Sequence, residues 1–160
     1  MRTKIDIHFI GERVASGAAD NLVFNVYRRG PNADDFEELA ARMESTAAAT
    51  KRRVAVLTYP LGPVQLPDAE TRAAAVRLRR AQDANVAAAA TVLDAGGFWS
   101  AAAISVINTV ALLSKGSTET KAFRNRTDAI AWLAPHCVVS TPSEIEKGLF
   151  SMLEAVHGAK

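Results

Sequence analysis

The chain has 160 residues, a length that fits one domain with a real hydrophobic core. Hydrophobic residues make up 49% of it and charged residues 22%, a balance that excludes a disordered chain and indicates an ordinary soluble protein. The formal net charge of +2 is too small to argue for nucleic-acid binding, and the single cysteine excludes an internal disulfide framework. We therefore expect one domain over residues 1–160, with a free thiol that fits the reducing cytoplasm.

Residues 1–30 predict an N-terminal β-hairpin. Residues 4–10 alternate apolar and polar side chains, which places three apolar ones on one side of a strand: Ile5, Ile7 and Phe9. Residues 16–21 are small or polar and predict a loop, and residues 22–28 predict the second strand. No segment at the N-terminus is apolar for long enough to be a signal peptide, and no stretch of the chain is long and apolar enough to span a membrane.

Two strand and helix units follow the hairpin. Asn32 is expected to cap a helix whose buried face is marked by apolar residues at helical spacing: Phe36, Leu39, Ala40 and Met43. Residues 54–58 predict a strand, which Tyr59-Pro60 should end because proline lacks the N–H group that pairs strands. Asp68 is expected to cap the next helix, which should reach about Ala84.

This next helix carries four arginines spread over nearly half of its circumference: Arg72, Arg77, Arg79 and Arg80. The usual explanation is a solvated face whose long aliphatic stems lie on the core. The alternative is a surface for a partner protein or for lipid headgroups. Arg72 and Arg79 are candidate residues of such a surface.

The stretch from Val86 to Leu133 forms the centre of the expected fold. Residues 87–93 are apolar without alternation, which predicts a strand buried on both faces of a sheet. A tight turn at Gly96-Gly97 precedes an apolar helix, for which Ser100 is a suitable N-cap and Gly116 a suitable end. A helix this apolar is buried, or it meets something outside its own fold.

Residues 118–123 predict an edge strand, and Asn125 with Asp128 predicts the start of a short helix that Pro135 ends. Trp132 on this helix is expected to be buried beneath the edge of the sheet as a core residue. The chain then continues to a second amphipathic helix.

Residues 121–123 and 128–133, read as Lys-Ala-Phe and Asp-Ala-Ile-Ala-Trp-Leu, resemble the "vFxxxxeAlaWL" ending of SpoIIAA-like proteins in the STAS/SEC14-type superfamily. Gly97-Phe98 and Ser105-Val106 are similar to the preceding helix in many bacterial members. The resemblance covers roughly residues 22–133. It implies an α/β fold with a mixed, mostly parallel central sheet of about five strands and helices on both faces. The strands that begin near Val54 and Ala87 should be central and parallel, with the hairpin at one edge and the Thr118 strand at the other.

Residues 141–157 lie beyond this resemblance and predict an extra C-terminal amphipathic helix. Thr141, Pro142 and Glu144 form a capping box with proline at the first helical position, and Gly148 allows another backbone to approach closely. The apolar side chains fall on one face: Ile145, Leu149, Met152, Leu153 and Val156. This face either covers part of its own sheet or packs on a second subunit, and we favour a homodimer.

No arrangement of residues predicts catalysis, a metal or a cofactor, so we expect a protein that is not an enzyme. The four possible soft ligands do not match a zinc spacing: His8, His136, Cys137 and His157. We interpret His136 and Cys137 as a helix-end histidine and a buried thiol. The sequence contains no Gly-x-Ser-x-Gly elbow and no phosphate-binding loop.

The resemblance implies a non-enzymatic regulatory or scaffold domain that acts by binding another protein. The anti-sigma-factor antagonists of this fold carry a phosphorylated serine in an Asp-Ser pair, but Ser100 follows Trp99, which puts such a phosphorylation in doubt. Besides Arg72 and Arg79, the candidate ligand or partner surface includes Phe98, Trp99, Ser100, Ser105 and Asn108.

The alternative is a small apolar-ligand or lipid-binding module of SEC14-like type, with a pocket lined by four residues: Phe98, Trp99, Ile104 and Trp132. We expect a cytoplasmic protein with a protein partner, no nucleic-acid partner and no stable membrane insertion.

Overall fold

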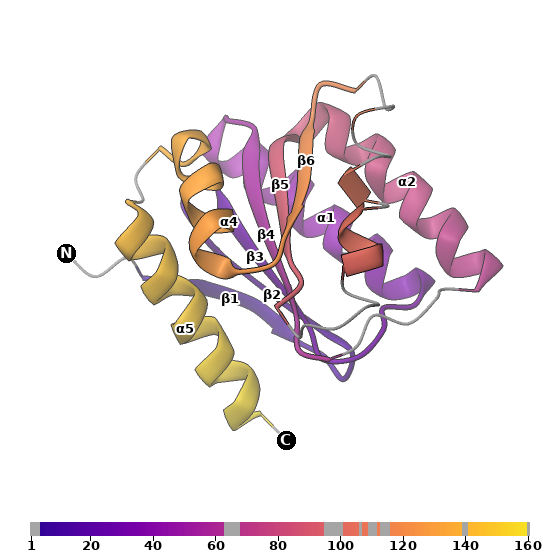
Figure 1. The fold of residues 1–160 in the computed structure, drawn as a ribbon, viewed down its shortest axis with the longest axis horizontal. Coiled ribbons are helices and arrows are strands. Elements are labelled where there is room, and N and C mark those ends of the chain that lie inside the picture. The colour runs from indigo at the N-terminus through magenta and orange to yellow at the C-terminus, as the bar shows by residue number, and fades with distance from the viewer. Residues whose placement is uncertain are drawn as a thin grey trace.

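The computed structural model describes residues 4–62, 68–94, 101–105, 107–108, 112, 116–138 and 141–159. These residues form a six-stranded sheet whose strands stand in the order of the chain (Figure 1). The strands are β1 (Asp6–Ile10), β2 (Val14–Ala19), β3 (Leu22–Tyr27), β4 (Val54–Pro60), β5 (Val86–Val92) and β6 (Glu119–Phe123).

The sheet is mixed and mostly parallel, as predicted. Strands β1, β2 and β3 form an antiparallel meander, and β3, β4, β5 and β6 are parallel to one another. The expectation that the Val54 and Ala87 strands are parallel and lie inside the sheet is confirmed, and so is the edge position of the strand near Thr118.

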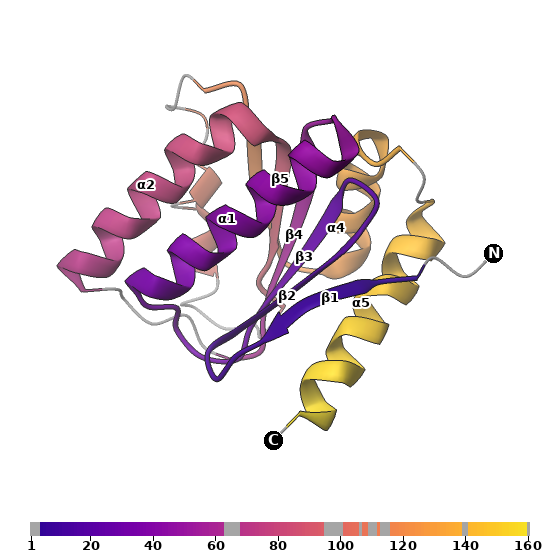
Figure 2. The ribbon, with the colours of Figure 1, turned by 180° about the vertical axis from the view of Figure 1, so that it is seen from behind.

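Helices cover both faces of the sheet. Helices α1 (Ala33–Thr50) and α2 (Ala69–Asn85) lie side by side on one face, and α4 (Arg126–Leu133) and α5 (Pro142–Gly158) lie on the other (Figures 1 and 2). A short 3₁₀ turn, η1 (Ala134–His136), links α4 to the segment before α5. The helices that join successive parallel strands share one face because such crossovers are right-handed.

The N-terminal hairpin differs from its prediction, because residues 16–19 belong to a further strand, β2, which lies between the two predicted strands and pairs with both. The turn from β2 to β3 is confined to Asp20 and Asn21. The small residues that suggested a loop are buried, and their size is a packing requirement. A Cβ at Gly17 would lie 3.0 Å from the carbonyl oxygen of Asp6 and 3.1 Å from the sulfur of Met152. A larger residue would therefore push apart β1, β2 and α5.

The alternation expected in the first strand is interrupted by a β-bulge between Ile7 and Phe9. Ile5 packs against the core beneath α4 and α5. Phe9 instead lies under the guanidinium of Arg42 on α1, whose carbon is 5.9 Å from the ring centroid. The prediction that the three apolar side chains share one side is wrong, since a bulge adds a residue and so changes the face that later residues occupy.

The prediction that Tyr59-Pro60 ends the fourth strand is also wrong, because β4 continues through Pro60. Pro60 pairs with Tyr27 at the end of the ladder, and the next amide, that of Leu61, donates to the Tyr27 carbonyl at 2.8 Å. Proline is tolerated there because the N–H group that it lacks falls where the strand ends.

Four of the expected helix starts are confirmed by side-chain caps, and the one expected at Ser100 lies outside the described residues. Asn32 and Asp35 form a reciprocal capping box, and Thr141 and Glu144 form another. Asp68 accepts a hydrogen bond from the Thr71 amide at 2.7 Å, which lowers the pKa of its carboxyl. The other cap is Asn125, whose side chain accepts from the Asp128 amide.

Helix α5 covers its own sheet. Four of its side chains are no more than 1% exposed: Ile145, Leu149, Met152 and Val156. They pack with Phe24 and other residues of β2 and β3 in the core beneath α4 and α5. The apolar face that motivated a homodimer is therefore satisfied within the chain, and the homodimer itself stays a prediction.

Trp132 is half-buried rather than fully buried. Its ring centroid lies 5.6 Å from that of Phe123 and 5.9 Å from that of His136. Helix α4 packs mainly over β5 and β4, and Trp132 lies beside the aromatic ring of Phe123 at the end of β6.

Gly148 on α5 provides a test of how closely this helix approaches the sheet. A Cβ at Gly148 would lie 2.8 Å from the ring of Phe24, which is 1% exposed and cannot move aside. We expect Gly148→Ala to lower the free energy of unfolding by about 1–3 kcal/mol, as overpacking does. Urea unfolding of the wild type and of Gly148→Ala measures this difference in the free energy of unfolding.

The matched control is Gly158→Ala, at the end of the same helix, where an added Cβ meets nothing within 4 Å. This change should leave stability unchanged or raise it by up to about 1 kcal/mol, because alanine is the better helix former. Equal effects of the two substitutions would contradict the close approach of α5.

Candidate functional site

The carboxyl ends of the parallel strands lie at one edge of the sheet, where loops of α/β proteins commonly carry functional residues. Three polar side chains from different segments meet at this edge. Tyr59 stands near the end of β4, Asp94 follows β5, and Arg126 is the first residue of α4 after β6.

Tyr59 and Asp94 are joined by a short hydrogen bond. The phenol oxygen of Tyr59 donates to Oδ2 of Asp94 at 2.5 Å. Burial raises the pKa of Tyr59, the hydrogen bond and negative charge of Asp94 raise it further, and the positive charge of Arg126 partly opposes this. Tyr59 is therefore a fixed, protonated donor, which holds the exposed Asp94 carboxylate in place.

Arg126 extends this group to helix α5. Its guanidinium carbon lies 4.7 Å from the ring centroid of Phe150, within the range of a cation–π contact. Phe150 is 43% exposed although it belongs to a helix that buries most of its large apolar side chains. We call the four residues Tyr59, Asp94, Arg126 and Phe150 the Tyr59 surface.

The sequence did not predict any residue of the Tyr59 surface. Its members come from four separate segments, and no motif links them. Only the topology could have indicated this surface in the sequence, because Tyr59, Asp94 and Arg126 end or follow neighbouring parallel strands. Tyrosine, phenylalanine and arginine are the types enriched at protein interfaces.

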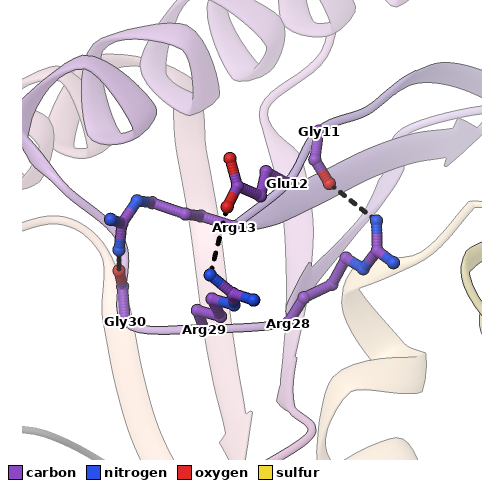
Figure 3. Close-up of polar contacts among 6 residues, drawn as sticks. All are labelled: Gly11, Glu12, Arg13, Arg28, Arg29 and Gly30. Carbon is purple, nitrogen blue, oxygen red and sulfur yellow. Dashed lines mark hydrogen bonds and ion pairs between the residues drawn. The ribbon is translucent and has the colours of Figure 1, made fainter. Parts of the chain in front are cut away.

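Three further arginines converge at the same edge of the sheet, around the turn between β1 and β2 (Figure 3). Each guanidinium is engaged with a backbone carbonyl or a carboxylate. Arg13 donates to the carbonyl of Gly30 at 3.2 Å, Arg28 to that of Gly11 at 3.0 Å, and Arg29 pairs with Glu12 at 3.1 Å (Figure 3).

Arg28 also reaches the end of α5. Its second terminal nitrogen donates to the carbonyl of Ala159 at 3.0 Å. A cation at this position suits the negative end of a helix dipole. Arg28 therefore ties the turn between β1 and β2 to the end of α5, and Arg13 and Arg29 tie the same turn to the segment after β3. These are structural roles.

The candidate residues from the sequence do not form one site among the described residues. Phe98, Trp99 and Ser100 lie outside the described residues. Ser105 is exposed, on the helical segment 101–105. Arg72 is exposed and Arg79 half-buried on α2, which lies across the sheet from α4 and α5.

Asn108 pairs with the outer edge of β6. Its Oδ1 accepts from the amide of Ala122 at 2.8 Å, and its Nδ2 donates to the Ala122 carbonyl at 3.4 Å. The side-chain amide thus takes the place of a neighbouring strand. Asn108 has this structural role, whether or not a partner also contacts it.

The surroundings of His136 and Cys137 agree with their interpretation from the sequence. The Cys137 thiol is partly buried, and it donates to the carbonyl of Leu133 at 3.6 Å. Burial raises its pKa to about 11. Nε2 of His136 lies 3.5 Å from a carboxylate oxygen of Glu119.

Within the described ranges, no three His, Cys, Asp or Glu side chains are grouped so that they could hold a metal ion. The helices of that same part of the chain include none with both the length and the apolar character needed to cross a membrane.

Comparison with known proteins identifies the fold. No family model and no curated protein matches the chain. It is similar to the crystal structure of an uncharacterised protein of the DUF3478 family with a SpoIIAA-like fold, from Shewanella loihica PV-4. The TM-score is 0.54 at 16% sequence identity, over 83% of this chain and 98% of the other. The chain therefore has a SpoIIAA-like α/β fold, as the resemblance in its sequence predicted.

Replacement of Asn108 should expose the edge of β6. We expect Asn108→Leu to lower stability by about 1–3 kcal/mol, because it leaves a partly buried amide and carbonyl without their partner. Hydrogen exchange of the Ala122 amide should become faster in this variant. The control is Ser105→Ala on the same segment, which should change neither quantity; unchanged exchange in Asn108→Leu would refute the strand-like pairing.

The Cys137 thiol should react slowly in the folded protein. Because its pKa is raised from 9.0 to about 11, the thiolate fraction at pH 8 falls by roughly a hundredfold. Alkylation by iodoacetamide should be slower by at least this factor than in urea-unfolded protein. Equal rates in the two states would show an ionised, accessible thiol and reopen a nucleophilic role.

Proposed function

We propose that this chain is a non-enzymatic regulatory or scaffold domain that binds another protein through the Tyr59 surface. One observation carries the proposal: side chains from β4, the end of β5, α4 and α5 form one partly exposed group that contains two aromatic residues and an arginine. Such groups supply most of the binding energy at protein interfaces.

The geometry also reduces the side-chain conformational entropy that is lost on binding. The hydrogen bond from Tyr59 fixes Asp94, and the ring of Phe150 supports the guanidinium of Arg126. Side chains that are already held in place lose little freedom when a partner arrives. Arg126 keeps N–H donors for a carboxylate or carbonyl of that partner.

Two further points support a binding role, and a third supports a place of action. The SpoIIAA-like fold agrees with the anti-sigma-factor antagonists that the sequence resembles, which act on partner proteins. The Cys137 thiol is protonated at neutral pH, and the Tyr59 phenol is a donor whose proton is held by Asp94. The single free cysteine supports the bacterial cytoplasm as the place of action.

The alternative, an apolar-ligand module, has weaker support. Two of its expected lining residues, Phe98 and Trp99, lie outside the described residues. Trp132 packs against Phe123 and His136.

The proposal predicts that Arg126→Glu weakens partner binding. Tagged full-length protein expressed in its source bacterium should retain a partner protein. The amount of that partner retained by Arg126→Glu should be about 30-fold lower, because removing an interface residue worth about 2 kcal/mol weakens binding by this factor. Quantitative mass spectrometry of the purified complexes measures the retained amount. Phe150→Ala should weaken the same partner.

Arg124→Glu is the matched control, since Arg124 is exposed, two residues away and subject to the same change of charge. It should retain the partner as the wild type does, and thermal unfolding should show all variants folded. A partner profile that is identical for wild type, Arg126→Glu and Phe150→Ala would eliminate the Tyr59 surface as the binding site.

A further inference from the structure

A second surface lies on the opposite side of the sheet, along the exposed side of α2. Arg72, Val76, Arg80 and Ala84 are spaced four residues apart, so they follow one line along this helix. Val76 is 52% exposed, one of the more exposed large apolar side chains in the described part of the molecule. This line spans about 18 Å at the rise of an α-helix.

The cations on this line are not used within the described fold. Arg77, on the side of α2 toward α1, pairs with Glu37 at 3.1 Å. Arg72 and Arg80 have no ion-pair partner among the described residues, and Arg72 influences the carboxylate of Asp68 only through its charge. Both side chains are exposed.

The line leads toward a groove where the carboxyl ends of α1 and α2 meet. The groove has a volume of about 400 Å³, and its lining combines small apolar residues with a basic rim: Glu44, Ala47, Ala48, Lys51, Arg52, Arg53, Ala84 and Asn85. Arg53 is fixed by hydrogen bonds to the Val86 carbonyl at 2.6 Å and to the Ser117 hydroxyl at 2.9 Å.

Lys51 and Arg52 at this groove have no ion-pair partner among the residues that the structure describes. Cations at this position help to balance the negative ends of two helix dipoles. That role does not account for Arg72 and Val76, which lie toward the other end of α2. We call the line and the groove together the α2 track.

We propose that the α2 track binds an acidic segment of a partner protein. The cations without an ion-pair partner complement an anionic occupant, and exposed Val76 between Arg72 and Arg80 offers an apolar contact to one side chain of that segment. The groove receives one end of the segment, since its alanines leave room and Lys51 and Arg52 supply charge. This surface is separate from the Tyr59 surface, so the proposal goes beyond the proposed function.

The neighbouring helix favours a narrow protein segment over an anionic membrane. Helix α1 lies beside α2 and carries exposed carboxylates on Asp34, Glu37 and Glu44. A flat anionic bilayer that touched α2 would also meet these groups and be repelled. A peptide that follows α2 need not approach Asp34 or Glu37, and Glu44 sits at the groove among three cations.

The test uses full-length protein and a fluorescein-labelled synthetic peptide of 18 residues, rich in glutamate with leucines at helical spacing. Fluorescence anisotropy should show saturable 1:1 binding. Arg72→Glu and Arg80→Glu should each weaken it by about tenfold, and Val76→Asp should weaken it as well. Arg124→Glu, on another part of the surface, makes the same change of charge and should weaken binding less than twofold.

Three outcomes would overturn the proposal. The first is no saturable binding of the acidic peptide. The second is an equal loss in Arg124→Glu, which would indicate attraction to overall charge. The third is preferential binding to phosphatidylglycerol vesicles that Arg72→Glu abolishes, which would assign the track to a membrane. Arg126→Glu should bind the peptide as the wild type does. A failure of the proposal for the α2 track is therefore distinguishable from a failure of the proposal for the Tyr59 surface.

Discussion

The close packing of α5 onto β2 and β3 is the contact on which the rest of the structure depends. It requires residues without side chains on both partners, because Gly148 lies against the ring of Phe24 and Gly17 lies against the sulfur of Met152. The same contact positions Phe150 beside Arg126, and it brings the end of α5 within reach of Arg28. The packing of one helix thus determines both the core and the Tyr59 surface.

The two edges of the sheet are protected by different means. At β6 the side-chain amide of Asn108 occupies the backbone groups of Ala122. At β1 the bulge interrupts regular pairing, and the polar side chains of Asp6 and His8 accompany it. Burial lowers the pKa of His8, whose Nδ1 atom is buried without a hydrogen-bond partner. Both devices discourage the pairing of these edges with other chains.

The sequence predicted features that depend on local chemistry and missed those that depend on distant contacts. Caps such as Asn32 and Thr141 act within one helical turn, so their residues suffice to place helix starts. Residues 16–19 have the composition of a loop, and their burial follows from contacts such as that with Met152, far along the chain. The Tyr59 surface was missed for the same reason. Asn108 was recognised as a notable residue, but its pairing with β6 requires the fold.

The order of the strands has a consequence for how the protein is made. Every strand pairs with its neighbours in sequence, so the sheet can grow in the direction of synthesis, and such local pairing favours fast folding. Helix α5 is the exception, because it returns to β2 and β3. A nascent chain therefore carries an uncovered apolar face on β2 and β3 until α5 leaves the ribosome. During this interval the growing chain is open to chaperones and to aggregation.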